Sequence, residues 1–359
     1  MIDESRVDLF TSHAEEYFAR YPLFKHVADR VGNNSFFITG ATGLFGSWIL
    51  AFLNWTIKRK FAEPKIAILS RNKTIVFPSW FEVVEGDVRN FRLDKTKYDY
   101  FIHLAAPSAL NTNHGMKDLE KFDILGRGTR HVLDLAQNLA RKRVLVASSG
   151  AVFGGFDSSR VHPISECDLS TLVYDSTNQG LGLGKKVAEF ITRDYCLNGR
   201  VDASVARCFS FVGPGLPTDL HYAVGNFVAD AITTRKITIE GNGLTQRSYM
   251  DLGDMVLWLL TILFDGRTGE DYNVGSNDAV TLYQLASKIK ELVDENIDIE
   301  VLDKADTNIG VPANFYYVPN VDKAIKQLDL KHLSNLNSSL AGFIGYQREF
   351  FSGNLNNCV

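Results

Sequence analysis

Short apolar runs alternate with longer amphipathic segments over about residues 35–210. The short runs are rich in β-branched and aromatic residues, as buried strands are, and the longer segments repeat their apolar positions at helical spacing. This alternation predicts an α/β fold in which helices cover both faces of a doubly wound parallel sheet. The expected strands are 35–39, 65–69, 81–85, 100–104, 143–147 and 203–207, and the expected helices are 44–58, 118–140 and 184–196.

The pattern changes after about residue 210. Helical segments, short strands and turns then mix, which predicts a smaller C-terminal α/β lobe beside the main sheet. Before residue 35, apolar positions at helical spacing predict one or two helices with a break at Pro22. Asparagine-rich stretches near 335–338 and 354–357 predict turns and a loose tail. The expected helices of the lobe lie near 222–235, 253–264 and 281–293, with a strand near 237–240.

Three glycines follow the first expected strand at the spacing G-x-x-G-x-x-G, namely Gly40, Gly43 and Gly46. The first lets the chain turn sharply, the second lets backbone approach a pyrophosphate, and the third lets helix and strand pack closely. The helix that follows offers unpaired N–H groups and the positive end of its dipole to a phosphate. Strand, glycine turn and helix in this order predict a dinucleotide-binding site.

The residues after the second expected strand bear on which dinucleotide is bound. Folds that prefer NAD place an acidic residue here for the ribose 2′-hydroxyl, whereas a nearby arginine accommodates a 2′-phosphate. This chain has Ser70, Arg71 and Lys73 here, and no acidic residue. We therefore predict NADP(H) as the favoured cofactor. NAD is the alternative if Arg71 and Lys73 are only solvated loop charges.

These features divide the chain into expected parts. A Rossmann-type dinucleotide-binding domain takes up residues 35–210, together with segments that return to it later. A helical extension precedes it at 1–34. A lobe that mainly binds substrate spans 211–345, and a tail covers 346–359.

Composition narrows the classes of function. Of the 359 residues, 45% are hydrophobic and 22% charged, and the net charge is −4. These values are ordinary for a soluble globular protein, and no basic excess points to nucleic acid. The four cysteines show neither C-x-x-C spacing nor a metal pattern, so reduced thiols in a cytoplasmic protein without a metal site are expected. We expect no membrane partner, because no apolar run approaches spanning length and the acidic start lacks the apolar core of a secretory signal.

Further motifs extend over about residues 35–330. They are TGATGLFG at 39–46, GDV at 86–88, HLAAPS at 103–108, SSGAVFG at 148–154, KKVAE at 185–189, RCFSFVGPG at 207–215, RSYMDLGDM at 247–255 and YNVGS at 272–276. In this order they resemble the extended short-chain dehydrogenase/reductase superfamily, in its nucleotide-sugar epimerase, dehydratase and reductase branch. The resemblance implies an NAD(P)-dependent enzyme that acts on a nucleotide-activated sugar.

The resemblance also implies roles for matched residues. Lys185 matches the lysine that binds the nicotinamide ribose, Ser149 matches the residue that hydrogen-bonds the reacting sugar oxygen, and Asp87 with Val88 would contact the adenine. Arg247 would bind the diphosphate of the sugar nucleotide, or would instead pair with Asp251 or Asp254. The implied cofactor-binding residues are Gly40, Thr42, Gly43, Leu44, Phe45, Gly46, Ser70, Arg71, Asp87, Val88, Leu104, Ala105, Ala106 and Lys185. The implied substrate-binding residues are Ser108, Ser149, Ser210, Asn226 and Arg247.

One catalytic position departs from the family pattern. The family motif Y-x-x-x-K puts a tyrosine one helical turn before the lysine, whose positive charge lowers the pKa of the tyrosine. Counting back from Lys185 gives Leu181, which cannot transfer a proton. Glu189, four residues after Lys185, fits the family pattern and supports this register.

The proton donor therefore has to be sought elsewhere. Tyr174, in the preceding loop, is our candidate catalytic residue beside Ser149 and Lys185. The alternatives are Ser149 or Lys185 themselves, His221 and water.

Several reactions stay open within this family. Dehydratases carry Asp-Glu directly after the serine position and decarboxylases a glutamate near it, whereas this chain has Gly150 and Ala151. Arg71 favours NADPH-dependent reduction of a 4-keto sugar nucleotide over an NAD-dependent 4-epimerase or a dehydratase or decarboxylase relative. A catalytically weak sugar-nucleotide-binding protein is a further alternative, suggested by Leu181 and the glycine-rich run 180–184, which we interpret as flexible.

A homodimer is the assembly that the resemblance implies. Family members often pair through two helices, which would lie at about 115–140 and 184–198 here. The apolar stripe expected to serve this contact is Leu133, Ala136, Leu139 and Ala140.

Overall fold

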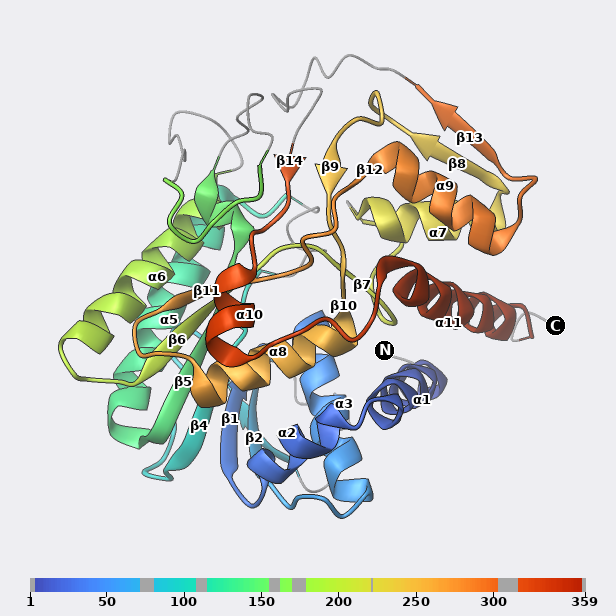
Figure 1. The fold of residues 1–359 in the computed structure, drawn as a ribbon. Coiled ribbons are helices and arrows are strands. Elements are labelled where there is room, and N and C mark those ends of the chain that lie inside the picture. Colours follow the sequence, from blue (N-terminus) through green and yellow to red (C-terminus); the bar gives the residue numbers. More distant parts are fainter. Residues whose placement is uncertain are drawn as a thin grey trace.

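The computed structural model describes residues 4–71, 81–107, 115–154, 162–169, 179–220, 222–302 and 316–356. Its centre is a seven-stranded parallel sheet in the order β11-β6-β5-β4-β1-β2-β3 (Figure 1). Because β4 adds next to β1 on the side opposite β2, this is the strand order of a doubly wound dinucleotide-binding sheet, and the predicted Rossmann-type fold is confirmed. The strands are β1 (Ser35–Thr39), β2 (Lys65–Ser70), β3 (Phe81–Glu85), β4 (Tyr98–His103), β5 (Ala140–Ser149), β6 (Ala203–Cys208) and β11 (Asp271–Val274).

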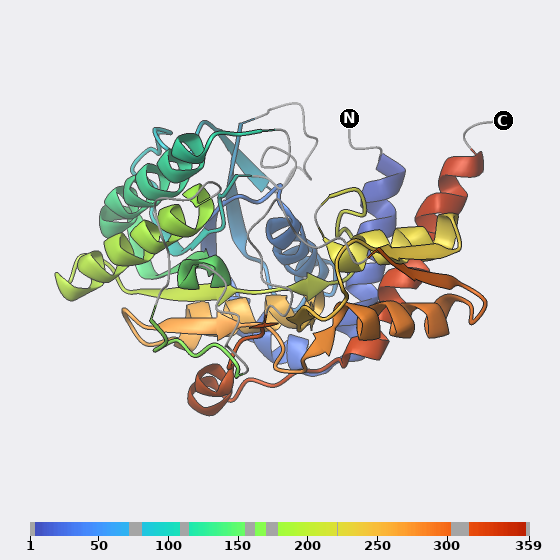
Figure 2. The same cartoon turned by 90° about the horizontal axis from the view of Figure 1, so that it is seen from above.

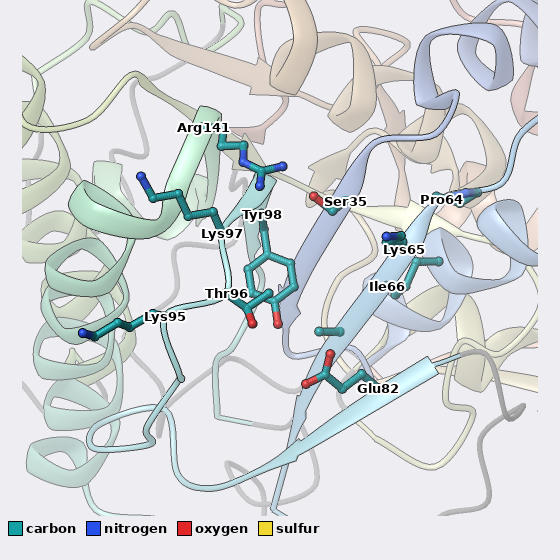
Figure 3. A pocket seen from close by; sticks show the side chains of 11 residues that line it. Ser35, Pro64, Lys65, Ile66, Glu82, Lys95, Thr96, Lys97, Tyr98 and Arg141 are labelled. Carbon is teal, nitrogen blue, oxygen red and sulfur yellow. The ribbon is translucent and has the colours of Figure 1, made fainter.

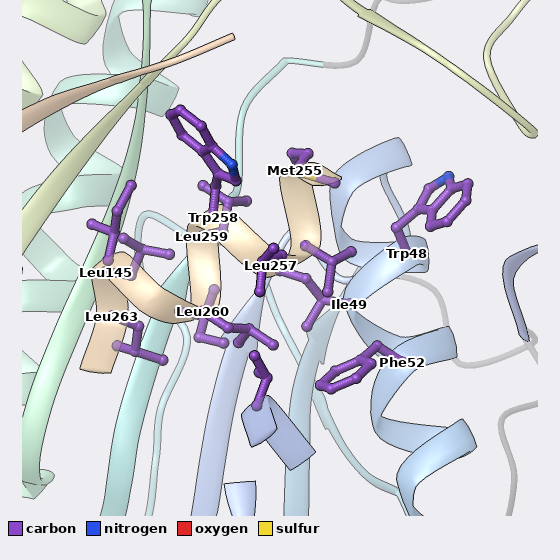
Figure 4. Close-up of a cluster of buried hydrophobic side chains, with 14 of the residues drawn as sticks. Trp48, Ile49, Phe52, Leu145, Met255, Leu257, Trp258, Leu259, Leu260 and Leu263 are labelled. Carbon is purple, nitrogen blue, oxygen red and sulfur yellow. The ribbon is translucent and has the colours of Figure 1, made fainter. Parts of the chain in front are cut away.

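Helices cover both faces of this sheet. Along β1, Phe36 and Ile38 face one hydrophobic core and Phe37 faces another, and all three are fully buried. The first core holds α3 (Leu44–Lys58) and α8 (Leu252–Asp265), whose aromatic and aliphatic side chains meet over the strands (Figure 4). The second core holds α5 (Asp118–Leu139) and α6 (Gly180–Leu197).

Helices α5 and α6 lie against each other through glycine. A Cβ at Gly180 would lie 2.6 Å from the Cα of Asp118, and one at Gly184 would lie 2.8 Å from Cδ1 of Leu125. The run 180–184 is therefore the first turn of α6 packed on α5, and its interpretation as flexible is wrong. The stripe expected at a dimer contact is also wrong, because Leu133 and Ala136 are buried in the chain's own core, and Leu139 and Ala140 pack against it.

In the described part of the chain, the smaller lobe has its own core, and three small sheets lie outside the large one. Strand β12 pairs antiparallel with β9, β14 pairs parallel with β9, and β8 pairs with β13. Figure 1 shows β8 and β13 beside α7 and α9, away from the large sheet, whereas β14 lies towards it. The remaining elements are η1 (Gly150–Phe153), β7 (Phe211–Val212), α7 (Ala223–Thr233), β8 (Lys236–Ile239), β9 (Gln246–Arg247), β10 (Met250–Asp251), β12 (Val280–Thr281), α9 (Leu282–Val293), β13 (Asp298–Val301), β14 (Tyr316–Tyr317) and α10 (Asp322–Leu328).

The two ends of the chain form helices that lie side by side (Figures 1 and 2). Helices α1 (Glu4–Arg20) and α2 (Leu23–Val31) confirm the predicted extension and its break at Pro22. The loose tail is wrong, because α11 runs from Leu336 to Asn356, and Asn335 accepts a hydrogen bond from the N–H of Ser338 at its start. Among the described helices, none has both the length and the apolar character needed to cross a bilayer.

A cluster of buried carboxyl groups joins α1 to α8. The Tyr17 hydroxyl donates to Asp254 at 3.0 Å, and the side chain of Asp251 accepts from the N–H of Gly253. The N–H groups of Leu333 and Ser334 also donate to Asp254. Burial raises the pKa of Asp251 to about 7 and that of Asp254 to about 6.

This cluster should make stability depend on pH. An unfolded aspartate has a pKa near 3.9, so between about pH 4 and 7 the folded chain binds protons that the unfolded chain has released, and stability falls as pH rises. Asp251→Asn keeps a good helix cap and removes the charge. We expect the free energy of unfolding of the variant, relative to that of the wild type, to rise by on the order of 1–3 kcal/mol as the pH is raised from 5 to 8. Urea unfolding at several pH values measures this, with the exposed Asp298→Asn as control; a pH-independent difference would contradict it.

Candidate functional site

The glycine turn lies at the carboxyl end of β1, in the middle of the sheet. Gly40 has φ 72°, and a Cβ there would lie 2.6 Å from the backbone N of Ala105. A Cβ at Gly46 would lie 2.5 Å from the Cα of Ala41. Glycine is thus required at both positions by backbone geometry and by the close packing of α3 on β1.

The start of α3 is open to an anion. Gly43 is the N-cap residue, no side chain caps the helix, and its first turn holds no acidic residue. The first N–H groups of α3 are therefore available to a pyrophosphate, whose charge the helix dipole favours. Thr42 and Gly43 are exposed, and Leu44 and Phe45 are partly buried beside them. These residues fit the phosphates of a dinucleotide.

The ends of β2 and β3 form the next part of the site. Ser70 is buried and Arg71 is exposed, and the charge of Arg71 contributes to lowering the pKa of Asp87. Arg89, which the sequence motifs did not single out, lowers the pKa of Asp87 more strongly, since it donates to both carboxylate oxygens at 2.8 and 2.9 Å. Val88 was expected at the adenine, but its side chain is buried against Gly128 of α5.

The chain after β4 passes beside the glycine turn. The N–H of Leu104 donates to the carbonyl of Thr39 at 3.1 Å, and exposure increases from the buried Leu104 through Ala105 to the exposed Ala106. His103, also not singled out before, bonds Thr39 at 2.7 Å and Thr129 at 3.0 Å, and burial lowers its pKa to about 3. A neutral histidine thus ties together β1, β4 and α5.

Ser149 ends β5 and begins the short helix η1. Its Oγ accepts a hydrogen bond from the N–H of Ala151 at 3.2 Å. Gly150 follows, and a Cβ on it would overlap the hydroxyl of Tyr317 and lie 2.8 Å from the ring of Phe209. Tyr317 is a residue that the sequence motifs missed; in the sequence it is only the second tyrosine of a short apolar run.

Lys185 lies in the first turns of α6, buried below the end of β5. Its Nζ donates to the carbonyl of Ala147 at 2.5 Å, and burial lowers the pKa of its amine to about 8. A lysine with this pKa can hold or release a proton near neutral pH. Leu181 precedes it by one turn in the same helix and is partly buried.

A buried ion pair fixes α6 behind Lys185. Glu189 accepts from Nε and Nη2 of Arg207 at 2.9 and 2.8 Å, and from the hydroxyl of Ser148 at 2.6 Å. Asp271 accepts from the same guanidinium at 2.6 Å. The matched glutamate of the KKVAE motif thus anchors α6 to β5, β6 and β11.

The residues expected to bind substrate lie towards the smaller lobe. The carbonyl of Ser210 accepts from the N–H of Met250, and the guanidinium of Arg247 lies 5.5 Å from the ring centre of Tyr317. Oδ1 of Asn226 is buried without a hydrogen-bond partner among the described residues, as an acceptor kept for a ligand would be. The alternative partners of Arg247 are engaged elsewhere, since Asp251 caps α8 and Asp254 bonds Tyr17.

Tyr174, Ser108 and His221 lie outside the described residues. Within the described ranges, no group of three or more histidine, cysteine, aspartate or glutamate side chains could hold a metal ion. A pocket between the amino ends of the strands, lined by residues such as Ser35, Lys65 and Tyr98, lies at the sheet edge opposite the glycine turn (Figure 3).

A glycine turn at an open helix end, a serine at the end of β5 and a buried lysine in α6 together define a short-chain dehydrogenase/reductase of the extended type. The chain belongs to the NAD dependent epimerase/dehydratase family, whose model matches residues 36–275. The predictions of this superfamily and of an enzyme are therefore confirmed.

Three proteins that this chain resembles share 25% or less of their aligned residues with it. UDP-glucuronic acid decarboxylase 6 of Arabidopsis thaliana is 25% identical over 286 residues, which cover 76% of this chain and 78% of that protein. A solved epimerase of Methanothermobacter thermautotrophicus has a TM-score of 0.74 at 23% identity, over 92% of this chain and 97% of that one. The dTDP-glucose 4,6-dehydratase of Bacillus anthracis in complex with NAD has a TM-score of 0.69 at 18% identity, over 88% and 97%. At these identities the two structures support the fold alone.

Proposed function

We propose that this protein is an NADP(H)-dependent oxidoreductase that reduces the keto group of a 4-keto nucleotide sugar. The cofactor part of the proposal rests on the end of β2, where Arg71 is exposed near Asp87 and residues 65–71 contain no acidic side chain. An arginine at this point accommodates a 2′-phosphate. The substrate part is supported by the family and by the decarboxylase relative, whose name specifies UDP-glucuronic acid.

The site's own residues suit this chemistry. The first N–H groups of α3 and the backbone at Gly43 would hold the pyrophosphate, and Lys185 would hold the nicotinamide ribose. Ser149 would donate a hydrogen bond to the keto oxygen and so stabilise the negative charge that develops there. The reduced dinucleotide, when bound, supplies the hydride. The absence of carboxylates at Gly150 and Ala151 disfavours dehydration, which needs an acid and a base at these positions.

Two other functions have support. The family description and the dehydratase solved with NAD favour an NAD-dependent 4-epimerase, which would regenerate its cofactor in each cycle. Leu181, in place of the motif tyrosine, favours a protein that binds sugar nucleotides with little turnover.

One measurement separates these functions. The purified protein is denatured, any released dinucleotide is identified by mass, and the empty protein is titrated with NADPH and NADH. We expect an empty site and a preference for NADPH. Tightly held NAD would contradict the reductase and favour the epimerase. A protein that binds neither dinucleotide would be neither a reductase nor an epimerase.

Arg71→Ala tests the cofactor preference directly. Loss of a charge-assisted hydrogen bond of about 1.5–3 kcal/mol should weaken NADPH binding about 10- to 100-fold. NADH lacks the 2′-phosphate, so its binding should change little. Calorimetric titration of both dinucleotides checks this, with Arg59→Ala, an exposed residue after α3, as control. Equal weakening of NADPH and NADH would argue against a 2′-phosphate contact.

We also propose that the protein is a homodimer. The predicted stripe is buried, but Leu119 of α5 and Phe190 and Leu197 of α6 are 78%, 72% and 79% exposed. Large apolar side chains exposed on these neighbouring helices favour a second copy as partner. Light scattering in solution should give twice the mass of the chain; the mass of one chain would contradict the proposal.

A further inference from the structure

Tyr317 reaches the turn after β5 from the smaller lobe. It belongs to β14, which pairs with β9 so that Tyr317 lies beside Arg247. Its hydroxyl lies so close to Gly150 that a Cβ there would overlap it, and the neighbouring Ser149 side chain is near enough to affect the pKa of the phenol. Its ring stacks at a tilt on Phe209, with ring centres 4.9 Å apart. The phenol is therefore held beside the residue that would contact the reacting oxygen.

Gly150 makes this approach possible. A side chain at position 150 would occupy the space of the Tyr317 hydroxyl, because even a Cβ there would overlap it. In this chain, the position that carries an aspartate in dehydratases therefore has to remain glycine. The glycine that stands in place of the acid thus leaves the space that the phenol of Tyr317 occupies.

The buried lysine serves the same end of β5, since Nζ of Lys185 donates to the carbonyl of Ala147, two residues before Ser149. Cys208, which pairs in register with Ser149, is near enough for its ionisation to affect the pKa of both Lys185 and Tyr317. Lys185 and Tyr317 thus approach the end of β5 from different elements, α6 and β14. The family motif instead brings its tyrosine from α6, at the position that Leu181 fills here.

We propose that Tyr317 is the proton donor that replaces the motif tyrosine. The inference rests on the proposed reduction of a keto group. When hydride adds to the keto carbon, its C=O π bond breaks and the oxygen becomes an alkoxide; the O–H bond of Tyr317 then breaks, its proton joins that oxygen, and the phenolate regains a proton from solvent.

The electrostatic surroundings agree with this role. Burial raises the pKa of Tyr317 to about 12, although the positive charge of Arg247 acts in the opposite direction. The phenol is thus protonated at neutral pH, as a donor must be before the transfer. The Arg247 guanidinium over the ring favours the phenolate that the transfer leaves behind.

The test compares Tyr317→Phe with its neighbour Tyr316→Phe. Adjacent strand residues point to opposite faces, so Tyr316→Phe is a matched control that removes the same hydroxyl on the side away from Ser149. NADPH oxidation is followed with UDP-4-keto-6-deoxyglucose and dTDP-4-keto-6-deoxyglucose. We expect Tyr317→Phe to lower kcat about 100- to 10,000-fold, with unchanged NADPH affinity and thermal midpoint, and Tyr316→Phe to keep wild-type kcat. Gly150→Ala should also lower kcat, because it displaces the hydroxyl without removing it.

A second readout does not depend on turnover. Both keto sugars are titrated by calorimetry into protein saturated with NADP⁺, and loss of the donor should weaken their binding in Tyr317→Phe but not in Tyr316→Phe. A Tyr317→Phe enzyme with kcat within threefold of wild type overturns the inference and leaves the proposed function standing. A wild-type protein that turns over neither sugar contradicts the proposed function; the inference then fails as well if Tyr317→Phe and wild type bind the sugars equally.

Discussion

Gly46→Ala is expected to abolish dinucleotide binding and to destabilise the protein by about 3 kcal/mol. Alanine is the better helix former by about 1 kcal/mol, so propensity alone would predict stabilisation within α3. Packing decides otherwise, because the added Cβ would lie 2.5 and 2.6 Å from backbone atoms of Ala41 and would overlap the carbonyl oxygen of Gly40. Backbone in a tight turn cannot move aside as a side-chain tip can, so α3 must shift away from β1 and its N–H groups leave the pyrophosphate position.

Gly342→Ala is the matched control for this variant. Gly342 lies inside α11, and apart from the backbone of its own helix turns no described heavy atom lies within 4 Å of the position of its added Cβ. There the propensity term acts alone, and we expect a gain of up to about 1 kcal/mol with unchanged cofactor binding. Urea unfolding followed by circular dichroism, together with NADPH and NAD titration, measures both effects. A Gly46→Ala protein that binds either dinucleotide with wild-type affinity would show that the turn can relax.

Glu189→Ala should cost about 3–5 kcal/mol of unfolding free energy, because it leaves a buried guanidinium without its main partner. The side chain of Arg207 is 4% exposed, and among the described residues it keeps hydrogen bonds to Asp271 and to the carbonyl of Glu166 once Glu189 is removed. The hydroxyl of Ser148 also loses its acceptor. A desolvated charge that loses its bidentate partner is much more costly than a lost surface ion pair.

Two comparison variants isolate the charge effect. Glu291→Ala removes an exposed carboxylate from α9 and should change stability by less than about 0.5 kcal/mol. The double variant Glu189→Leu/Arg207→Met replaces the pair by apolar groups and should recover part of the loss, because the buried guanidinium is gone while Asp271 loses its partner. Urea midpoints measure all three proteins. If Glu189→Ala lies within 1 kcal/mol of wild type, the guanidinium has found water or another partner.

Much of the central fold could be predicted from local sequence. Strand β1 and helix α3 have the predicted bounds, since a fully apolar strand, a glycine turn and an apolar helical repeat are all local signals. The positions of Ser149 at the carboxyl end of β5 and of Lys185 in α6 agree with the motifs that matched the family. The predicted open helix end at the glycine turn was likewise confirmed by the structure.

The differences arise where distant contacts override local preference. Glycines disfavour a helix, so α6 was expected to begin at 184, yet it begins at Gly180 because these glycines let it pack on α5. Asparagines near 335 suggested a turn, but one of them caps α11. Tyr317 could not be found from spacing, because only the pairing of β14 with β9 brings it to Ser149.

The packing of α1 on α11 has a consequence for synthesis of the chain. His13 contacts Glu349, which lies 336 positions later in the sequence, whereas Phe18 on the same helix packs on Trp48 and Phe52 of α3. While the ribosome is still translating the sheet, one side of α1 can already be buried, but its other side waits for the last helix. During that interval the apolar side of α1 that α11 will cover stays exposed, and chaperones can bind it. Chains that terminate before α11 should therefore remain bound to chaperones and should not be released as a stable shortened protein.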